Sequence, residues 1–201
     1  MQILYQDKHL IVVNKPSGLL SQPGSIKDSV HTRLQSQFNF VGLIHRLDQA
    51  TSGIMVLALT PFALSNIAKQ FQDRRTFKVY EARVFGRIPA CKGHIDLPLR
   101  CDWPNRPRQE VHTEGRQSLT HWRLLNIEGN CSRVELIPHT GRSHQLRVHM
   151  KAMGFPMVGD YFYAHKEALS LSERLHLHAK TLRINHPMTG QPLTFQCKAP
   201  F

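Results

Sequence analysis

Long apolar stretches are missing from this sequence of 201 residues. No run approaches the roughly 18 apolar residues that a membrane-spanning helix needs. Charged side chains interrupt the apolar run between Met1 and Val13, so we expect no secretory signal peptide. These absences predict a protein that does not enter a membrane and that works in the cytoplasm.

Paired cysteines are missing as well, because the four cysteines form no Cys-x-x-Cys motif. Their spacing argues against a zinc ribbon and against a disulfide framework. Thirteen histidines are present, among them His139, His144 and His149, and the pair His176 and His178. They have no cysteine or carboxylate partners at ligand spacing, so the sequence predicts no metal site.

Acidic residues are few: 14 Asp and Glu face 26 Lys and Arg, which gives a net charge of +12 and a pI of about 10.0. Such an excess favours a polyanionic partner, and nucleic acid is the first candidate. A solvated basic surface is the alternative interpretation. Membrane binding is disfavoured, because the charge is spread along the chain and no basic amphipathic helix gathers it.

No internal repeat, low-complexity tract or long linker divides the chain, which predicts a single catalytic domain over residues 1–201. The clearest interruption is the segment from Ile95 to Gly115, where prolines and arginines surround Trp103. We expect an extended excursion between strands. It is either a loop that faces RNA or a proline-stiffened loop packed on Trp103, and these residues alone do not decide between the two.

Alternating apolar residues predict strands, and helical periodicity is rarer. The expected strands cover 9–14, 54–59, 76–85, 120–127 and 133–138, and Glu128-Gly129-Asn130 predicts a hairpin turn between the last two. Thr60 and Pro61 predict the start of a helix with an apolar stripe through Leu64, Ile67, Ala68 and Phe71. A second helix is expected from Ser143 to Gly154. The fold class is therefore α+β, with a mainly antiparallel mixed sheet and flanking helices.

One carboxylate has unusual surroundings. Asp48 is the sole acidic residue between Asp28 and Asp73, and it lies in a basic segment just before an apolar strand. Such an environment keeps a carboxylate ionised, which is the form that a nucleophile or general base needs. A structural ion pair with an arginine is the alternative.

A second polar segment runs from Pro138 to His149, where a strand end meets a helix start. Free backbone amides and Arg142 would attract phosphate at such a point. Arg147, one turn into the expected helix, is a candidate partner for Asp48.

Three runs together resemble the RluA family of pseudouridine synthases. They are His45-Arg-Leu-Asp48 with Thr51-Ser-Gly53, the run Gly141-Arg-Ser-His-Gln-Leu-Arg-Val-His149, and Asn14-Lys-Pro-Ser-Gly18. Gly159-Asp160 and Leu177-His-Ala179 follow in the same order, so the resemblance covers essentially the whole chain. Within the family, the segment from Cys101 to Pro107 most resembles the member that modifies both a 23S ribosomal RNA loop and the anticodon stem-loop of certain tRNAs. The resemblance to that member also implies a chain without an N-terminal S4-type RNA-binding domain.

The resemblance implies a role for each matching residue. Asp48 corresponds to the catalytic aspartate, Arg147 to the arginine that pairs with it, and Tyr80 to the tyrosine that stacks on the target base. Arg46 corresponds to a residue that enters the RNA where the uridine leaves, and Leu177 to an apolar residue of the base pocket.

The expected activity is isomerisation of uridine to pseudouridine in stem-loops of 23S rRNA and tRNA, by a monomer without cofactor or metal. Two rivals remain open. A non-catalytic RNA-binding module would bind the same loops without chemistry. A nucleosidase would use Asp48 to activate water and would release free uracil.

Overall fold

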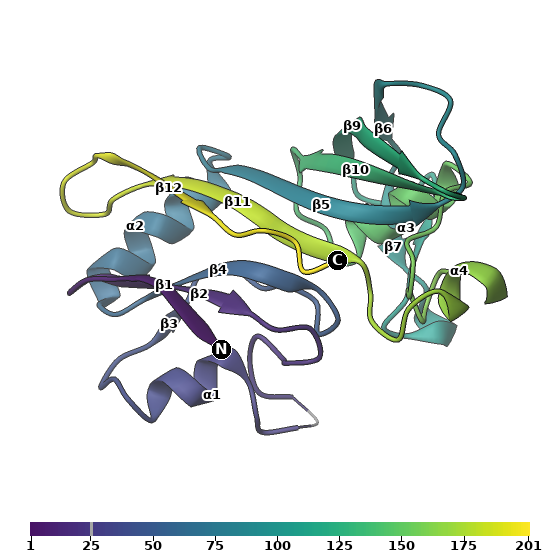
Figure 1. The fold of residues 1–201 in the computed structure, drawn as a ribbon. Coiled ribbons are helices and arrows are strands. Elements are labelled where there is room, and N and C mark those ends of the chain that lie inside the picture. Colours follow the sequence, from purple (N-terminus) through teal and green to yellow (C-terminus); the bar gives the residue numbers. More distant parts are fainter. Residues whose placement is uncertain (25) are drawn as a thin grey trace. The chain divides into compact units, whose positions relative to one another are not determined.

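The chain forms two compact units, and the computed structural model describes residues 1–24 and 26–201 of it (Figure 1). The first unit comprises 1–78 and 178–200, and the second comprises 79–177 with Phe201. The expected single catalytic domain over the whole chain stays a prediction.

The sheet of the first unit has the strand order β1-β2-β4-β11, with β12 paired to β11 and β3 paired to β4. Its strands are β1 (Gln2–Gln6), β2 (Leu10–Lys15), β3 (Gly42–Leu43), β4 (Ser52–Ala58), β11 (Leu177–Asn185) and β12 (Pro192–Gln196). These pairs are antiparallel except β4 with β11, which run parallel. Every residue of β4 is buried, as expected for a central strand.

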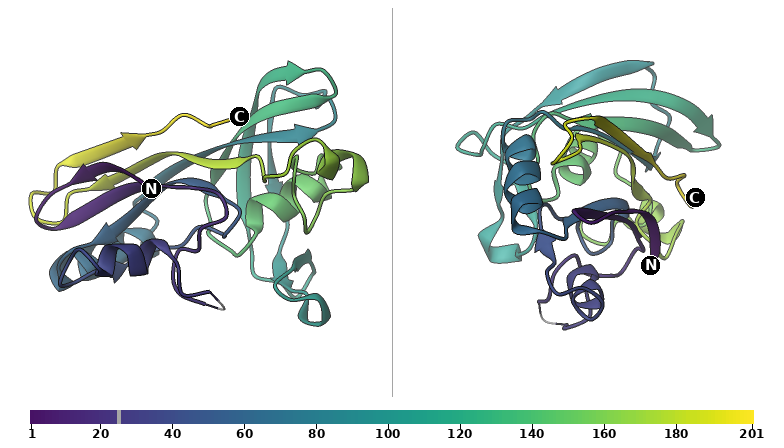
Figure 2. Two further views of the ribbon diagram at one scale, coloured as in Figure 1. Left: turned by 60° about the horizontal axis from the view of Figure 1, so that its bottom comes forward. Right: turned by 90° about the vertical axis from the view of Figure 1, so that its left-hand side faces the viewer.

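Two helices belong to the first unit, α1 (Val30–Gln35) and α2 (Pro61–Gln72). The predicted start of α2 is confirmed: the Thr60 side chain accepts a hydrogen bond from the Ala63 amide at 3.2 Å, and Pro61 follows it. Ala63 and Ile67 pack into a core with Val56 and Ala58 of β4, while Leu64 and Phe71 lie at the edge of that core. Both helices lie beneath the strands of this unit in the left view of Figure 2.

The second unit contains the antiparallel sheet β5-β10-β9-β6. Its strands are β5 (Phe77–Phe85), β6 (Lys92–Asp96), β9 (Leu119–Glu128) and β10 (Cys131–Pro138). The predicted hairpin turn between β9 and β10 is confirmed, and Gly129 adopts a φ of +61° there. Glycine suits that turn because its backbone enters the left-handed region without strain.

The segment predicted to be an extended excursion contains a small antiparallel hairpin. Its strands are β7 (Leu99–Cys101) and β8 (Gln109–Val111), and a short 3-10 turn, η1 (Trp103–Asn105), lies between them. Trp103 is 67% exposed, and the Arg106 guanidinium lies 3.3 Å from the centre of its ring. The tryptophan therefore does not serve as the core of the loop, which removes the packing alternative considered for this segment.

Two helices complete the second unit, α3 (Gln145–Ala152) and α4 (Lys166–Ser170). The helix α3 begins at Gln145, two residues later than predicted. His144 adopts a left-handed φ of +52°, so the right-handed helix starts only after it. Gln145 and His149 bind the buried Thr120 of β9 through side-chain hydrogen bonds of 2.9 Å each. The predicted α+β class with a mainly antiparallel mixed sheet is confirmed. None of the helices in the described part of the chain is long and apolar enough to cross a membrane.

Candidate active site

The loop that carries Asp48 is held by a buried lysine. Lys15, the last residue of β2, has no exposed surface, and its Nζ donates to the carbonyl oxygens of Pro16 at 3.0 Å, Leu19 at 2.6 Å and Gln49 at 3.0 Å. Burying an ammonium group is costly unless hydrogen bonds replace the lost water. The three carbonyl groups supply that compensation, and one of them belongs to the residue directly after Asp48.

Further hydrogen bonds fix the same loop from the segment that follows β2. Ser21 Oγ donates to the Leu47 carbonyl at 2.7 Å and accepts from the Leu47 amide at 3.0 Å. Ser17 Oγ donates to the Ala50 carbonyl at 2.7 Å, and the Gly18 amide donates to the Gln49 carbonyl at 2.9 Å. The main chain is therefore held on both sides of Asp48. The Asp48 side chain is half-buried, and Arg46 is exposed.

The strand after the loop depends on a glycine. Gly53 adopts a φ of +115°, and a Cβ at this position would collide with the main chain of Ala179. Such a close approach allows β4 and β11 to pair at Ser52 with His178 and at Gly53 with Ala179. Ser52 Oγ lies 2.8 Å from His178 Nδ1. The end of the Asp48 loop is thereby tied to β11.

His45, three residues before Asp48, acts as a hydrogen-bond acceptor within the first unit. Its Nε2 accepts from the Val56 amide of β4 at 3.1 Å, and its ring stacks on Phe71 of α2 with centroids 4.7 Å apart. Burial, together with the charge of Lys78, lowers the pKa of His45 to about 3. The imidazole is therefore neutral near pH 7, as an acceptor at Nε2 must be.

In the second unit the central feature is a buried ion pair. Arg147 Nε donates to Asp160 Oδ2 at 2.9 Å and Nη2 donates to Oδ1 at 2.7 Å, and the two side chains are 3% and 0% exposed. Asp160 Oδ1 also accepts from the Phe162 amide at 3.0 Å. This bidentate contact fixes the plane of the guanidinium.

Two aromatic rings lie beside this pair. The Arg147 guanidinium lies 5.3 Å from the centre of the Phe162 ring and 5.1 Å from that of Tyr163. The Tyr163 hydroxyl accepts from the Gln109 amide of β8 at 2.8 Å and lies 2.7 Å from His144 Nδ1. Tyr163 thus joins the β7–β8 hairpin to the start of α3.

The other predicted residues of the second unit lie at separate places in it. Tyr80 is half-buried on β5, opposite Leu136 of β10. Arg142 lies just before α3, where its Nε approaches the Gln117 carbonyl at 3.4 Å. Leu177 is 3% exposed at the start of β11.

The structure thus brings Arg147, Asp160 and the two rings together, and it holds Asp48 on an immobilised loop of the other unit. The pairing of Asp48 with Arg147 stays a prediction. Lys15 and Asp160 both lie in runs that carried the resemblance, yet the sequence did not predict their structural roles. Neither the hydrogen bonds of Lys15 nor the ion pair of Asp160 can be inferred from neighbouring residues. His45 and Tyr163 were also missed as structural residues.

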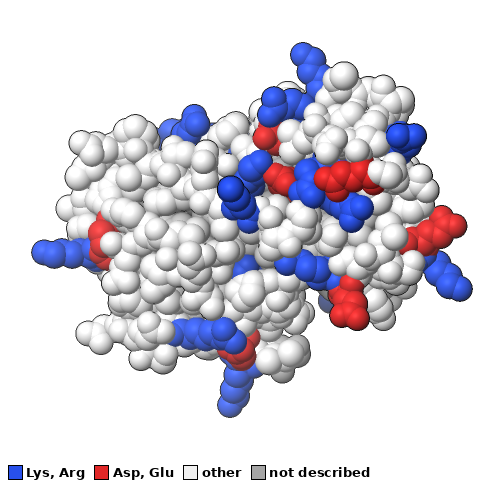
Figure 3. Space-filling model, in the orientation of Figure 1, with Lys and Arg blue, Asp and Glu red and all other residues white. Residues whose placement is uncertain are grey.

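Charged side chains of both signs lie on the surface of the second unit. Figure 3 shows acidic side chains beside basic ones on the visible face of the second unit. Ion pairs in that unit include Arg133 with Glu81 and with Glu128, both at 2.7 Å, and Arg123 with Glu135 at 3.0 Å. Within residues 1–24 and 26–201 there is no group of three or more His, Cys, Asp or Glu side chains arranged to hold a metal ion.

Comparison with known proteins places these features in context. Residues 9–152 match the family described as RNA pseudouridylate synthase. The dual-specificity RNA pseudouridine synthase RluA of Yersinia pestis is 53% identical over 206 residues, which span 100% of both chains. The protein of the same name from Escherichia coli K12 is 51% identical over 204 residues, which cover 99% of this chain and 93% of that one.

Solved structures show the same fold. Human RNA Pseudouridylate Synthase Domain Containing 1 has a TM-score of 0.87 at 30% identity, covering 100% of this chain and 84% of that chain. Human RNA Pseudouridylate Synthase Domain Containing 4 has a TM-score of 0.80 at 27% identity, covering 99% and 88%.

Proposed function

The chain belongs to the RNA pseudouridylate synthase family, and on that premise we propose that Asp48 carries its chemistry, with Arg147 holding the carboxylate ionised. Membership confirms the resemblance seen in the sequence and makes the protein an isomerase that converts uridine in RNA to pseudouridine. The observation that carries the assignment of Asp48 is the immobilised main chain on both sides of it. A loop fixed in this way positions a reacting carboxylate before the substrate arrives.

The reaction exchanges one glycosidic bond for another. The N1–C1′ bond breaks, the uracil turns while it stays bound, and C5 joins C1′; the hydrogen lost from C5 is balanced by the one gained at N1. Three first steps suit a carboxylate at this position, namely attack at the sugar, attack at the uracil ring, and removal of the C2′ proton. Each keeps the overall change redox-neutral, so the proposal includes no cofactor.

The target base must leave the stack before any of these steps. We assign Tyr80 to stacking on the flipped uracil, Leu177 to the apolar wall of its pocket, and Arg46 to the gap that the uridine leaves in the RNA. The exposure of Arg46 is compatible with insertion into RNA. Arg142, next to the start of α3, is assigned to a phosphate group.

The proposed substrates are stem-loops in both 23S rRNA and tRNA, with the anticodon stem-loop as the tRNA site. The support is the dual specificity in the names of relatives that match the whole chain. We further propose that the protein acts as a monomer in the cytoplasm and that residues 1–201 serve as one catalytic domain.

The test compares wild type with Asp48→Asn on a stem-loop RNA, using carbodiimide adducts to detect pseudouridine and gel shift to measure binding. We expect Asp48→Asn to lose conversion by a factor of at least about 10³ while it binds the RNA nearly as well, because removal of a nucleophile abolishes the chemical step and leaves most contacts in place. Equal conversion by both proteins would remove Asp48 from the chemistry.

Two further measurements separate the remaining alternatives. Release of free uracil by the wild type would indicate a nucleosidase. Mapping of pseudouridine across all RNA in a strain without the protein would identify the substrates, and loss from ribosomal RNA alone would contradict dual specificity.

A further inference from the structure

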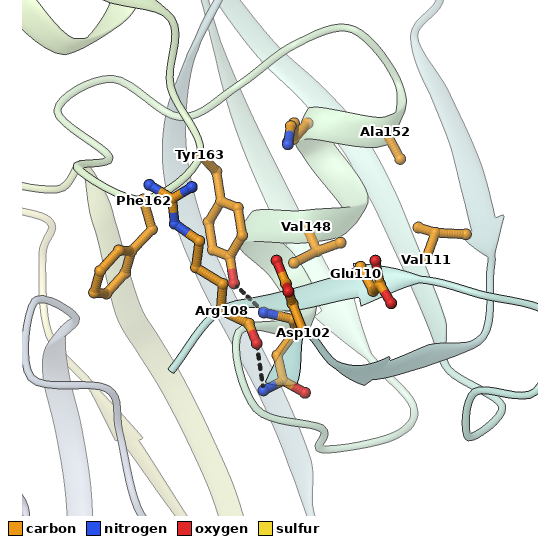
Figure 4. Close-up of a pocket in the computed structure, with 10 residues that line it drawn as sticks. Asp102, Arg108, Glu110, Val111, Val148, Ala152, Phe162 and Tyr163 are labelled. Carbon is orange, nitrogen blue, oxygen red and sulfur yellow. Dashed lines mark hydrogen bonds between the residues drawn. The ribbon is translucent and has the colours of Figure 1, made fainter. Parts of the chain in front are cut away.

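A pocket lies in the second unit, between α3 and the β7–β8 hairpin, with a volume of about 320 Å³. This volume falls at the lower end of the roughly 300 to 1,000 Å³ typical of ligand sites. Figure 4 shows side chains of α3 and of β8 facing each other across it, with Tyr163 at one end. None of the residues assigned to the uridine reaction lines this pocket.

The walls of the pocket are apolar and aromatic. Val148 and Ala152 lie one turn apart on the same face of α3, Val111 lies on β8, and the rings of Phe162 and Tyr163 complete the lining. The hydrogen bond from the Gln109 amide to the Tyr163 hydroxyl holds the hairpin against this ring. The two rings are inclined at 67° to each other, so the pocket has an aromatic face and an aromatic edge among its walls, and such walls suit a planar ligand.

Its charged groups balance one another. Arg108 and Lys151 contribute two positive charges to the lining, and Asp102 and Glu110 contribute two negative ones. Arg100 binds the Glu110 carboxylate at 2.8 Å from outside this set. The carboxylates still disfavour a phosphate, and a plain hydrocarbon would remove water from the charged lining without supplying hydrogen bonds in return. A neutral planar group with N–H donors along one edge satisfies both conditions, since carboxylates accept hydrogen bonds from such edges in nucleobases.

The surroundings favour RNA as the source of that group. The exposed Trp103 ring with Arg106 stacked on it belongs to the same hairpin as Asp102 and Arg108. Arginine and aromatic side chains of this kind hold phosphates and stack on bases in single-stranded RNA. The rings of Phe162 and Tyr163 also contact the guanidinium of Arg147. An occupant of the pocket is therefore close to the arginine that we assign to the uridine reaction.

We propose that this pocket holds one nucleobase of the substrate RNA other than the target uridine, at a position near the target in the same loop. The inference rests on the proposed function for its substrate, and it adds a specificity-determining site to it. Recognition here would select RNA by a base that undergoes no chemistry.

The experiment combines changes in the RNA with changes in the protein, and measures the Kd of each protein for each stem-loop RNA. Each loop position except the target is replaced in turn by an abasic nucleotide, and Ala152→Phe fills the pocket from α3. Wild type should show one position whose abasic form binds about tenfold more weakly, because stacking of one base in a protein site has about that effect. The variant Ala152→Phe should bind intact RNA about tenfold more weakly than wild type does. Its Kd should not rise further when the sensitive position is made abasic.

Matched variants control for the substitution itself. Ala90→Phe introduces the same ring at an exposed alanine of the second unit, outside the pocket, and should keep the tenfold loss at the sensitive position. Val111→Phe fills the pocket from β8 instead of α3 and should reproduce the result of Ala152→Phe even if the latter disturbs the helix. The idea is refuted if no position is sensitive in wild type, or if the losses from the abasic site and from both filling variants multiply.

The source of the base and the dependence on the proposed function are tested separately. Cytidine monophosphate and guanosine monophosphate at millimolar concentration should not displace the RNA. If they displaced it from wild type but not from the two filling variants, the pocket would be assigned to free nucleotides instead. Because the experiment measures Kd, it remains interpretable if Asp48 proves not to act in catalysis.

Discussion

Replacing Asp160 by asparagine should strongly destabilise the protein, because it removes the carboxylate that binds the buried guanidinium of Arg147 through two hydrogen bonds. The two side chains are 3% and 0% exposed and are joined by contacts of 2.9 and 2.7 Å. Removal of one member of such a pair costs about 3 to 5 kcal/mol. For a chain of this size each kcal/mol lowers the melting temperature by roughly 2 to 4 °C, so we expect a decrease of roughly 6 to 20 °C.

The chain provides a matched control in Asp28. Its carboxylate binds Arg33 with the same bidentate geometry, at 2.7 Å for both contacts, but the side chains are 51% and 45% exposed. Asp28→Asn should leave the melting temperature nearly unchanged, because water solvates both partners once the pair is broken. Thermal unfolding followed by circular dichroism measures the three proteins under one condition.

A double variant tests the cause. Arg147→Met with Asp160→Leu removes both charges, and such replacements of buried pairs are often neutral in stability. The double variant should therefore melt closer to wild type than Asp160→Asn does. If Asp160→Asn and Asp28→Asn melted within about 2 °C of each other, burial would not determine the strength of these pairs and the reasoning would fail.

Three further predictions follow from the first unit. Lys15→Met removes one donor from each of three carbonyl oxygens, so conversion should fall while the Kd for RNA changes little. Single-turnover kinetics with gel shift measures both, and an unchanged rate would contradict the positioning role. His45 has a pKa of about 3 in the folded protein and an ordinary value of 6.5 when unfolded, so the unfolded state binds more protons between these values and stability falls as the pH drops through that window. His45→Gln, which keeps an acceptor for the Val56 amide, should flatten the dependence of the urea midpoint on pH from 6.5 to 3, and an unaltered slope would show that other groups cause it. Gly53→Ala should destabilise by about 2 kcal/mol or more through its φ and the collision with Ala179, whereas Gly129→Ala, with open space around it, should lose less in urea unfolding.

Local signals in the sequence predicted the elements that depend on neighbouring residues. Thr60 and Pro61 specified the start of α2, and Gly129 specified the turn between β9 and β10. The start of α3 was misplaced because the left-handed conformation of His144 has no glycine to indicate it. Gln70 was missed for a related reason: it is buried because it binds the main chain of Asn185, far along the sequence, through both ends of its amide.

The candidate site shows the same division. Resemblance of motifs predicted Asp48 and Arg147 as site residues, but it did not reveal what holds them in place. The partners of Lys15 are carbonyl oxygens, which every residue possesses, so their arrangement depends on the folded loop rather than on residue type. Asp160 lies thirteen residues from Arg147, and only the course of the chain between them brings the two together.

Isomerisation makes a demand on the site that hydrolysis does not. The cleaved uracil must turn and rejoin the same sugar, so a carboxylate with the role that we propose for Asp48 has to keep its place while the base moves. Hydrogen bonds from Lys15, Ser17 and Ser21 fix the main chain around Asp48 without help from the substrate. Binding energy from RNA contacts can then drive base flipping instead of ordering this loop. Two classes of variant should therefore be separable: substitutions at Lys15 should lower the rate at saturating RNA, whereas substitutions in the pocket beside Phe162 should weaken RNA binding.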